Sequence, residues 1–184
     1  MDARNIAIAV APNGGRKTKA DHPALPLTPA ELAATAAECL EAGASMIHVH
    51  VRDAEGRHLL DAEAYRTTTA AIRDAVGGRL VVQITSEALG IYRPDEQMRV
   101  VRETRPEAVS LALREYLGDG AGEKAFADFL SWLAREEVLP QIILYDLEDA
   151  ARLEALRGRG ALPWENVPVL YVLGRYTKTQ QSAP

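Results

Sequence analysis

Residues 46–52 read MIHVHVR, and the alternation of polar and apolar side chains along this stretch separates two candidate folds. A period of two is typical of a β-strand, so His48, His50 and Arg52 lie on one face and the aliphatic residues between them on the other. A strand covered by helices on both sides reads apolar on both faces. One polar and one apolar face instead suits a (β/α)8 barrel, whose lumen holds a site near the carboxyl ends of the strands. The stretch therefore favours an α/β fold of the TIM-barrel type over an open doubly wound sheet.

The rest of the chain repeats the order strand–helix five times and ends on a sixth strand. We predict strands at Ile6–Ala11, Met46–Arg52, Leu80–Thr85, Ala108–Leu113, Gln141–Tyr145 and Val167–Leu173, and helices at Pro29–Ala42, Ala62–Val76, Pro94–Glu103, Gly122–Glu136 and Leu147–Arg157. Such strict alternation implies parallel strands with right-handed crossovers. A barrel of this type has eight strands and typically ~250 residues. We therefore expect residues 1–184 to form a single, incomplete TIM-barrel domain with about six of the eight strands.

The first predicted helix carries its own start and stop signals. Thr28 and Glu31 have the spacing of a capping box, in which each side chain accepts the other residue's backbone N–H. Pro29 occupies the first helical position, where its missing N–H costs nothing. Gly43 follows the last turn, as glycine does at many helix ends. These local signals predict the helix independently of the barrel.

The composition is that of an ordinary globular domain and excludes several classes of protein. The 184 residues are 47% hydrophobic and 26% charged, with a formal net charge of −5, a balance that disfavours intrinsic disorder. No run approaches the ~18 apolar residues of a membrane span. The chain has no dense basic stripe, so we expect neither nucleic acid nor a membrane as a partner. The single cysteine, Cys39, forbids an internal disulfide and fits a reducing, cytoplasmic location.

His48 and His50 are the strongest chemical signal in the sequence. Two imidazoles at positions i and i+2 of a strand point the same way and can share one divalent cation, with Zn–N bonds of ~2.0–2.1 Å. The alternative is a pair of hydrogen-bonded core histidines. Two unsatisfied imidazoles in a barrel lumen would be costly, which favours the metal. Histidine ligands usually donate their other N–H to an acceptor, and Asp53 is the candidate for that role.

The loop Asn13-Gly14-Gly15-Arg16 follows the first predicted strand and falls at the same rim of the barrel. Its glycines allow a tight turn and close approach of the backbone to a ligand, although a plain turn explains them as well. The loop matches neither GxGxxG nor the full P-loop pattern. Arg16, Lys17 and Lys19 make the loop locally cationic, which suits an anionic substrate, while solvated surface charge is an equally good account of the two lysines. We retain Arg16 as a candidate substrate-binding residue.

Three hydroxyl side chains lie at or near strand ends: Thr85 and Ser86 after the third predicted strand, and Ser110 within the fourth. Hydroxyls in such positions can bind a carboxylate or carbonyl oxygen of a substrate, or they can cap the next turn, and both interpretations stay open. The remaining histidines, His22 and His58, are interpreted as surface or turn residues.

Several segments together make the chain resemble the β-keto acid cleavage enzymes, the family that includes 3-keto-5-aminohexanoate cleavage enzyme. The matching segments span nearly the whole chain in order: the loop after the first strand through Leu25–Pro29, Ala42-Gly43-Ala44, Ile47–Asp53 with its HxHxRD pattern, Tyr65, Arg73 and Val172-Leu173-Gly174. The segment from the AGA motif to HxHxRD is the most specific of these.

The resemblance implies a (β/α)8 barrel in which His48 and His50 bind Zn²⁺. It also implies an acyl transfer in which a β-keto acid and acetyl-CoA give acetoacetate and a new acyl-CoA, with the metal acting as a Lewis acid. Thr85 and Ser110 fall where the family places hydroxyls that contact the substrate. The resemblance and the open sheet edges imply a homo-oligomer.

The sequence departs from the family pattern in three respects. Arg16 stands where the aminohexanoate enzyme has a glutamate, and Ile143 stands where that enzyme has an acidic residue facing the substrate amine. Both changes favour an anionic or neutral substrate over an amino-substituted one. The third zinc ligand, a glutamate, and the catalytic Arg and Asp of the family lie on its last two strands, and nothing before Pro184 replaces them. We therefore expect an incomplete form of a longer enzyme, with no activity of its own.

Two other functions remain open. The chain could be a truncated, non-catalytic family member that serves as a binding or interaction module, although such a protein has little use for histidines in a lumen. It could also be a metal-dependent hydrolase of the amidohydrolase type, which carries HxH on its first barrel strand with further histidines downstream. Here the pair is on the second predicted strand and no histidine follows His58, which disfavours that class.

Overall fold

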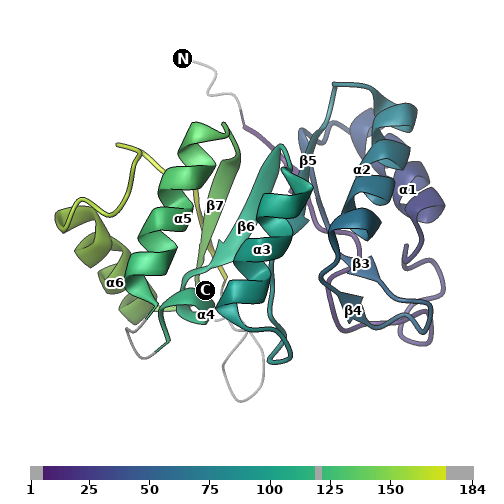
Figure 1. The fold of residues 1–184 in the computed structure, drawn as a ribbon. Coiled ribbons are helices and arrows are strands. Elements are labelled where there is room, and N and C mark those ends of the chain that lie inside the picture. Colours follow the sequence, from purple (N-terminus) through teal and green to yellow (C-terminus); the bar gives the residue numbers. More distant parts are fainter. Residues whose placement is uncertain (1–5, 119–121, 173–184) are drawn as a thin grey trace.

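A computed structural model of the chain describes residues 6–118 and 122–172. Its main sheet has six strands, β1 (Ala9–Val10), β2 (Met46–Val49), β5 (Val81–Thr85), β6 (Ala108–Ala112), β7 (Leu139–Leu144) and β8 (Val169–Tyr171), paired in that order and all parallel. Each strand therefore lies beside the strand that precedes it in the main sheet. A doubly wound sheet reverses its order at a switch point, and this sheet has no reversal. The order confirms the TIM-barrel type of α/β fold, with a curved sheet flanked by helices (Figure 1).

The helices follow the strands as predicted, with bounds that differ by at most one residue at either end. They are α1 (Pro29–Glu41), α2 (Ala62–Val76), α3 (Pro94–Thr104), α5 (Glu123–Arg135) and α6 (Leu147–Gly158). The capping box of Thr28 and Glu31 is present at the start of α1, and Asp61 caps α2 by accepting the N–H of Ala64. A short helix, α4 (Leu113–Leu117), was not predicted and takes over directly where β6 ends.

The predicted strand Met46–Arg52 is wrong in its second half. β2 ends at Val49, and Val51–Arg52 forms a separate strand, β3, which pairs antiparallel with β4 (His58–Leu59). The side chain of Asn13 causes the break: its Oδ1 accepts the backbone N–H of His50 at 3.2 Å, and its Nδ2 donates to the carbonyl of His50 at 2.8 Å. An amide side chain thus takes both backbone groups of His50 and ends the parallel pairing there.

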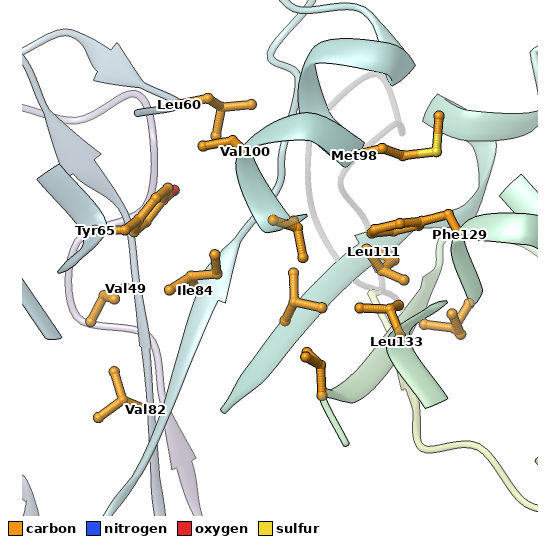
Figure 2. Close-up of a cluster of buried hydrophobic side chains, with 14 of the residues drawn as sticks. Val49, Leu60, Tyr65, Val82, Ile84, Met98, Val100, Leu111, Phe129 and Leu133 are labelled. Atoms are coloured by element: carbon orange, nitrogen blue, oxygen red, sulfur yellow. The ribbon is translucent and has the colours of Figure 1, made fainter. Parts of the chain in front are cut away.

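The outer face of the sheet supplies the hydrophobic core. Its side chains are at most 1% exposed: Ile47 and Val49 of β2, Val82 and Ile84 of β5, Val109 and Leu111 of β6, and Ile142 and Leu144 of β7. They pack with buried residues of the covering helices, among them Tyr65 of α2, Val100 of α3, and Phe129 and Leu133 of α5 (Figure 2). Burial of this apolar surface is the main force that holds helices to sheet.

The inner face is set by the register of the strands. His48 lies opposite Gln83, Thr85 lies opposite Ser110, and Ser110 lies opposite Gln141. Residues in register across a parallel sheet point to the same side, so these five polar side chains all lie on the concave face, at two neighbouring levels: His48 with Gln83, and Thr85 with Ser110 and Gln141. The fold therefore places the histidine pair at one end of this group of polar side chains, the polar row, which spans four strands.

The outermost strands are shorter than predicted. β1 covers Ala9–Val10 instead of Ile6–Ala11, and Ile6 and Ile8 are 84% and 51% exposed. β8 covers Val169–Tyr171 instead of Val167–Leu173, and Leu173 and Gly174 lie outside the described residues. An edge strand has a ladder of hydrogen bonds on one side only, which explains why both are cut short. Among the described residues, no helix is both long enough and apolar enough to cross a membrane.

Candidate functional site

The rings of His48 and His50 converge on one point. Their Nε2 atoms are 3.2 Å apart, and the ring planes meet at 75°. Two ligands of a tetrahedral zinc ion with bonds of ~2.0–2.1 Å stand about 3.3 Å apart. The spacing of the two nitrogens fits two ligands of one zinc ion, and it equally fits a hydrogen bond between the two rings, the alternative considered for this pair.

Gln83 supports His48 from behind. Its Oε1 accepts a hydrogen bond from Nδ1 of His48 at 2.8 Å, and its Nε2 donates to Oε1 of Gln141 at 3.3 Å. With the proton held on Nδ1, the lone pair of His48 lies on Nε2, the atom that faces His50. The prediction that Asp53 accepts the N–H of a histidine ligand is wrong. Its carboxylate instead accepts a hydrogen bond from Arg57 at 2.7 Å and belongs to the turn between β3 and β4. Gln83 could have been found because it is a polar residue two positions before Thr85, on the same face of an otherwise apolar strand.

Burial favours the uncharged form of His48. Desolvation is the largest influence on its pKa and lowers it below the ordinary value for histidine, with the hydrogen bond to Gln83 acting in the opposite direction. A neutral imidazole is the form that binds a metal. The electrostatics of the site and its geometry thus agree.

The interpretation of His58 as a surface or turn residue is wrong. The residue lies in β4 and is buried, with only 6% of its surface exposed. Its ring lies 5.5 Å from the ring of His50, centroid to centroid, and its Nε2 donates to the backbone carbonyl of Glu87 at 2.7 Å. Burial lowers the pKa of His58, and the charges of Arg52 and Arg16 lower it further. The β3–β4 hairpin thus places a third imidazole beside the pair. The prediction of one continuous strand over residues 46–52 did not include this hairpin and so missed the position of His58.

Arg52 ties the glycine loop to the hairpin. Its guanidinium donates to the carbonyls of Gly14 at 2.5 Å, Lys17 at 3.0 Å and Gly56 at 2.7 Å. Arg16, in the loop so held, is exposed, and its charge is felt by His58. The loop is thus fastened to the hairpin that carries His58, and the role of Arg16 in substrate binding stays a prediction.

The three candidate hydroxyls differ in what surrounds them. Thr85 accepts the N–H of Glu87 at 3.0 Å, and Ser86 accepts from Tyr116 and donates to the carbonyl of Ser110, both at 2.6 Å. These are the turn-capping and packing roles weighed for them. Ser110 is 2% exposed, and its Oγ has no hydrogen-bond partner among the residues described. Of the three, Ser110 is the one whose hydroxyl is left for another group.

Within residues 6–118 and 122–172, no group of three or more His, Cys, Asp or Glu side chains is arranged to hold a metal ion. The histidine pair is thus a two-ligand arrangement in the described part of the chain. A cavity of about 420 Å³ lies beside the hairpin turn, lined by residues 18–20, 27–28 and 52–56, and not by either histidine.

Comparison with known proteins shows what the chain is similar to. A 3-keto-5-aminohexanoate cleavage enzyme of Fusobacterium nucleatum is 31% identical over 146 residues, which are 77% of this chain and 53% of that protein. A 3-oxoadipate:acetyl-CoA acetyltransferase of Cupriavidus necator is 26% identical over 159 residues, 84% of this chain and 55% of that protein. The chain thus spans about half the length of these curated relatives.

A solved structure agrees with the fold. The ternary complex of ObcA with a C4-CoA adduct and oxalate superposes with a TM-score of 0.66 over 83% of this chain and 38% of the other, at 15% sequence identity. The family model of the beta-keto acid cleavage enzymes matches residues 5–184, which is almost the entire sequence. The histidine pair, the glycine loop and the strand order all lie within that match, and the chain belongs to the β-keto acid cleavage enzyme family.

Proposed function

We propose that this chain supplies the histidine half of a zinc-dependent site for β-keto acid cleavage with acetyl-CoA as co-substrate. The reaction exchanges acyl groups: the β-keto acid and acetyl-CoA give acetoacetate and the acyl-CoA of the remaining fragment. The observation that carries the proposal is the 3.2 Å approach of the Nε2 atoms of His48 and His50. The names of relatives that act on keto acids or use acetyl-CoA support the same reaction.

His48 and His50 would hold the zinc ion through their Nε2 atoms, because Gln83 keeps the Nδ1 proton of His48 turned away from it. When bound, zinc supplies a Lewis acid that polarises the keto and carboxylate oxygens of the substrate. Ser110 lies on the same concave face and offers a buried hydroxyl to a substrate oxygen. Arg16 offers a cation at the rim. The chain's own residues thus bind and orient the keto acid.

Zinc content measured on the purified chain tests the ligand assignment. We expect close to one zinc per chain in the wild type and almost none in the His48→Ala/His50→Ala variant. His22→Ala removes an exposed histidine and should leave the zinc content at the wild-type level. Equal zinc in the wild type and the double variant would refute the assignment.

The substrate is proposed to be an anionic or neutral keto acid. Arg16 is a cation, and Ile143 lies on the concave face in register with Ala112, so neither position offers a partner for an ammonium group. We expect the zinc-loaded chain to bind a β-keto acid with a second carboxylate more tightly than one with an amino group, as measured by calorimetry. Arg16→Glu should narrow or reverse that preference. A wild-type preference for the amino compound would contradict the proposal.

A further inference from the structure

The ring of His50 is held between two groups on opposite sides. Its Nε2 faces Nε2 of His48 at 3.2 Å, while its Nδ1 faces Oε2 of Glu87 at 3.9 Å. The His50 side chain is 6% exposed and that of Glu87 16%. A carboxylate this close to a buried imidazole is well placed to fix which ring nitrogen carries the proton.

The backbone of Glu87 is fixed on both sides. Its N–H donates to Oγ1 of Thr85 at 3.0 Å, which closes the turn after β5, and its carbonyl accepts from Nε2 of His58 at 2.7 Å. His58 is itself buried beside the ring of His50. The backbone that carries the Glu87 side chain is therefore held by two hydrogen bonds beside His50.

Gly15 leaves room for the approach of the two groups. A Cβ atom at this position would lie 3.3 Å from Nδ1 of His50 and 3.4 Å from Oε2 of Glu87, and 2.7 Å from Cδ1 of Leu89. A side chain there would crowd both the imidazole and the carboxylate and would displace Leu89. The absence of a side chain at position 15 therefore lets His50 and Glu87 face each other.

We propose that Glu87 is a positioning residue whose carboxylate accepts the Nδ1 proton of His50 and so turns the Nε2 lone pair toward a zinc ion shared with His48. The inference rests on the proposed function. Glu87 would do for His50 what Gln83 does for His48, since each would bond the nitrogen that points away from the metal. The role requires the 3.9 Å separation to shorten to a charge-assisted hydrogen bond of ~2.8 Å when the metal is bound.

Zinc affinity of the chain, measured by competition with a chelating dye, tests this role. We expect Glu87→Ala to lose affinity 10- to 100-fold, the range found when the outer partner of a ligand is removed. Glu87→Gln keeps an oxygen acceptor and should stay within about tenfold of the wild type. Glu55→Ala removes the same charge from the exposed turn after β3 and should leave the affinity unchanged.

Nitrogen NMR of the zinc-loaded chain provides a readout that mere support of the fold would not move. In the wild type the proton of His50 should sit on Nδ1 and the metal on Nε2, and Glu87→Ala should weaken or exchange that proton. Unfolding of the metal-free variants reports whether they are folded. If Glu87→Ala is not, the NMR of Glu87→Gln carries the test: the His50 Nδ1 proton signal should shift, because an amide oxygen is a weaker acceptor than a carboxylate, and an unshifted signal would overturn the role.

Two failures are distinguishable. Zinc bound by the wild type, lost in His48→Ala/His50→Ala and unchanged in both Glu87 variants would overturn this inference and leave the proposed function standing. A wild-type chain that holds no zinc at the histidine pair would overturn both.

Discussion

The two faces of the sheet are built from alternate residues of the same strands, yet they are filled in opposite ways. On the outer face, Ile84 of β5 and Leu111 of β6 are fully buried under helices (Figure 2). On the inner face, Gln83 and Ser110 are equally inaccessible, each 2% exposed, but they are polar. The two faces are therefore buried to the same extent, but one carries apolar and the other polar side chains.

The difference separates what folds the chain from what the site needs. An apolar side chain under a helix stabilises the fold simply by leaving water. A buried polar side chain loses its hydrogen bonds to water, and hydrogen bonds within the protein offset that loss with only a small net gain in stability. Gln83 offsets it through His48 and Gln141, whereas the hydroxyl of Ser110 finds no partner among the described residues. Stability alone gives no reason for the polar row, and a bound ligand does.

The largest effect should come from the outer face. Leu111→Ala removes a fully buried side chain from between β6 and the covering helices, and we expect the free energy of unfolding to fall by about 2–5 kcal/mol. Denaturant titration measures this. The zinc affinity of whatever remains folded should be unchanged, because the substitution does not touch the inner face. A loss below about 1 kcal/mol would mean that the helix layer does not pack as described.

The next effect should come from the inner face and appear in metal binding. Gln83→Leu keeps the volume of the side chain but removes the acceptor of His48, so we expect a 10- to 100-fold loss of zinc affinity. Gln141→Leu is the matched control, because it leaves the bond between Gln83 and His48 in place. Its affinity should change by less than about threefold, a difference of roughly 0.6 kcal/mol. Similar losses in both variants would show that the whole row acts as one network.

Helices and strand order were predictable because their signals are local. The caps at Thr28 and Asp61 and the apolar runs place each predicted helix within one residue at either end, since hydrogen-bond partners three residues away determine where a helix begins. The alternation through His48 and His50 likewise predicted two rings on one side. The polar and apolar faces of residues 46–52 predicted the barrel, and the resemblance to a family implied the same fold.

The supports of the site were not predictable in the same way, because they come from distant parts of the chain. Asn13 breaks β2 from 37 positions away, and Gln83 bonds His48 across 35. Asp53 looked like the natural acceptor for an imidazole because it is close in sequence, but Arg57 is closer to it in space. His58 was likewise interpreted as a surface or turn residue, because the pairing of β3 with β4 that places it beside His50 is not visible in the local sequence.

A smaller effect, away from both faces, is expected at the start of α1. Lys19 and the backbone N–H groups of Leu27 and Thr28 lower the pKa of Glu31 to about 2. A carboxyl with a lowered pKa stabilises the folded state above its ordinary pKa and loses that contribution as the pH falls. Glu31→Gln should therefore melt slightly below the wild type at neutral pH, with the difference shrinking from about pH 4.5 toward pH 2. A difference that is constant over this range would contradict the assignment.

The smallest effect on stability, and the sharpest contrast, is expected one residue before Leu111. Ser110→Ala removes a buried hydroxyl that has no hydrogen-bond partner in the described part of the chain, while the Ser110 carbonyl keeps its bond from Ser86. Losing an unsatisfied polar group is close to neutral, so the free energy of unfolding should change by less than about 1 kcal/mol in either direction. Binding of a β-keto acid to the zinc-loaded variant should nevertheless weaken about tenfold, the loss of one hydrogen bond of roughly 1.4 kcal/mol. Calorimetry measures substrate binding and denaturant titration measures the free energy of unfolding. Both are compared between Ser110→Ala and Leu111→Ala. If Ser110→Ala destabilises as much as its neighbour and binds substrate as well as the wild type, the inner face is structural and the contrast between the faces disappears.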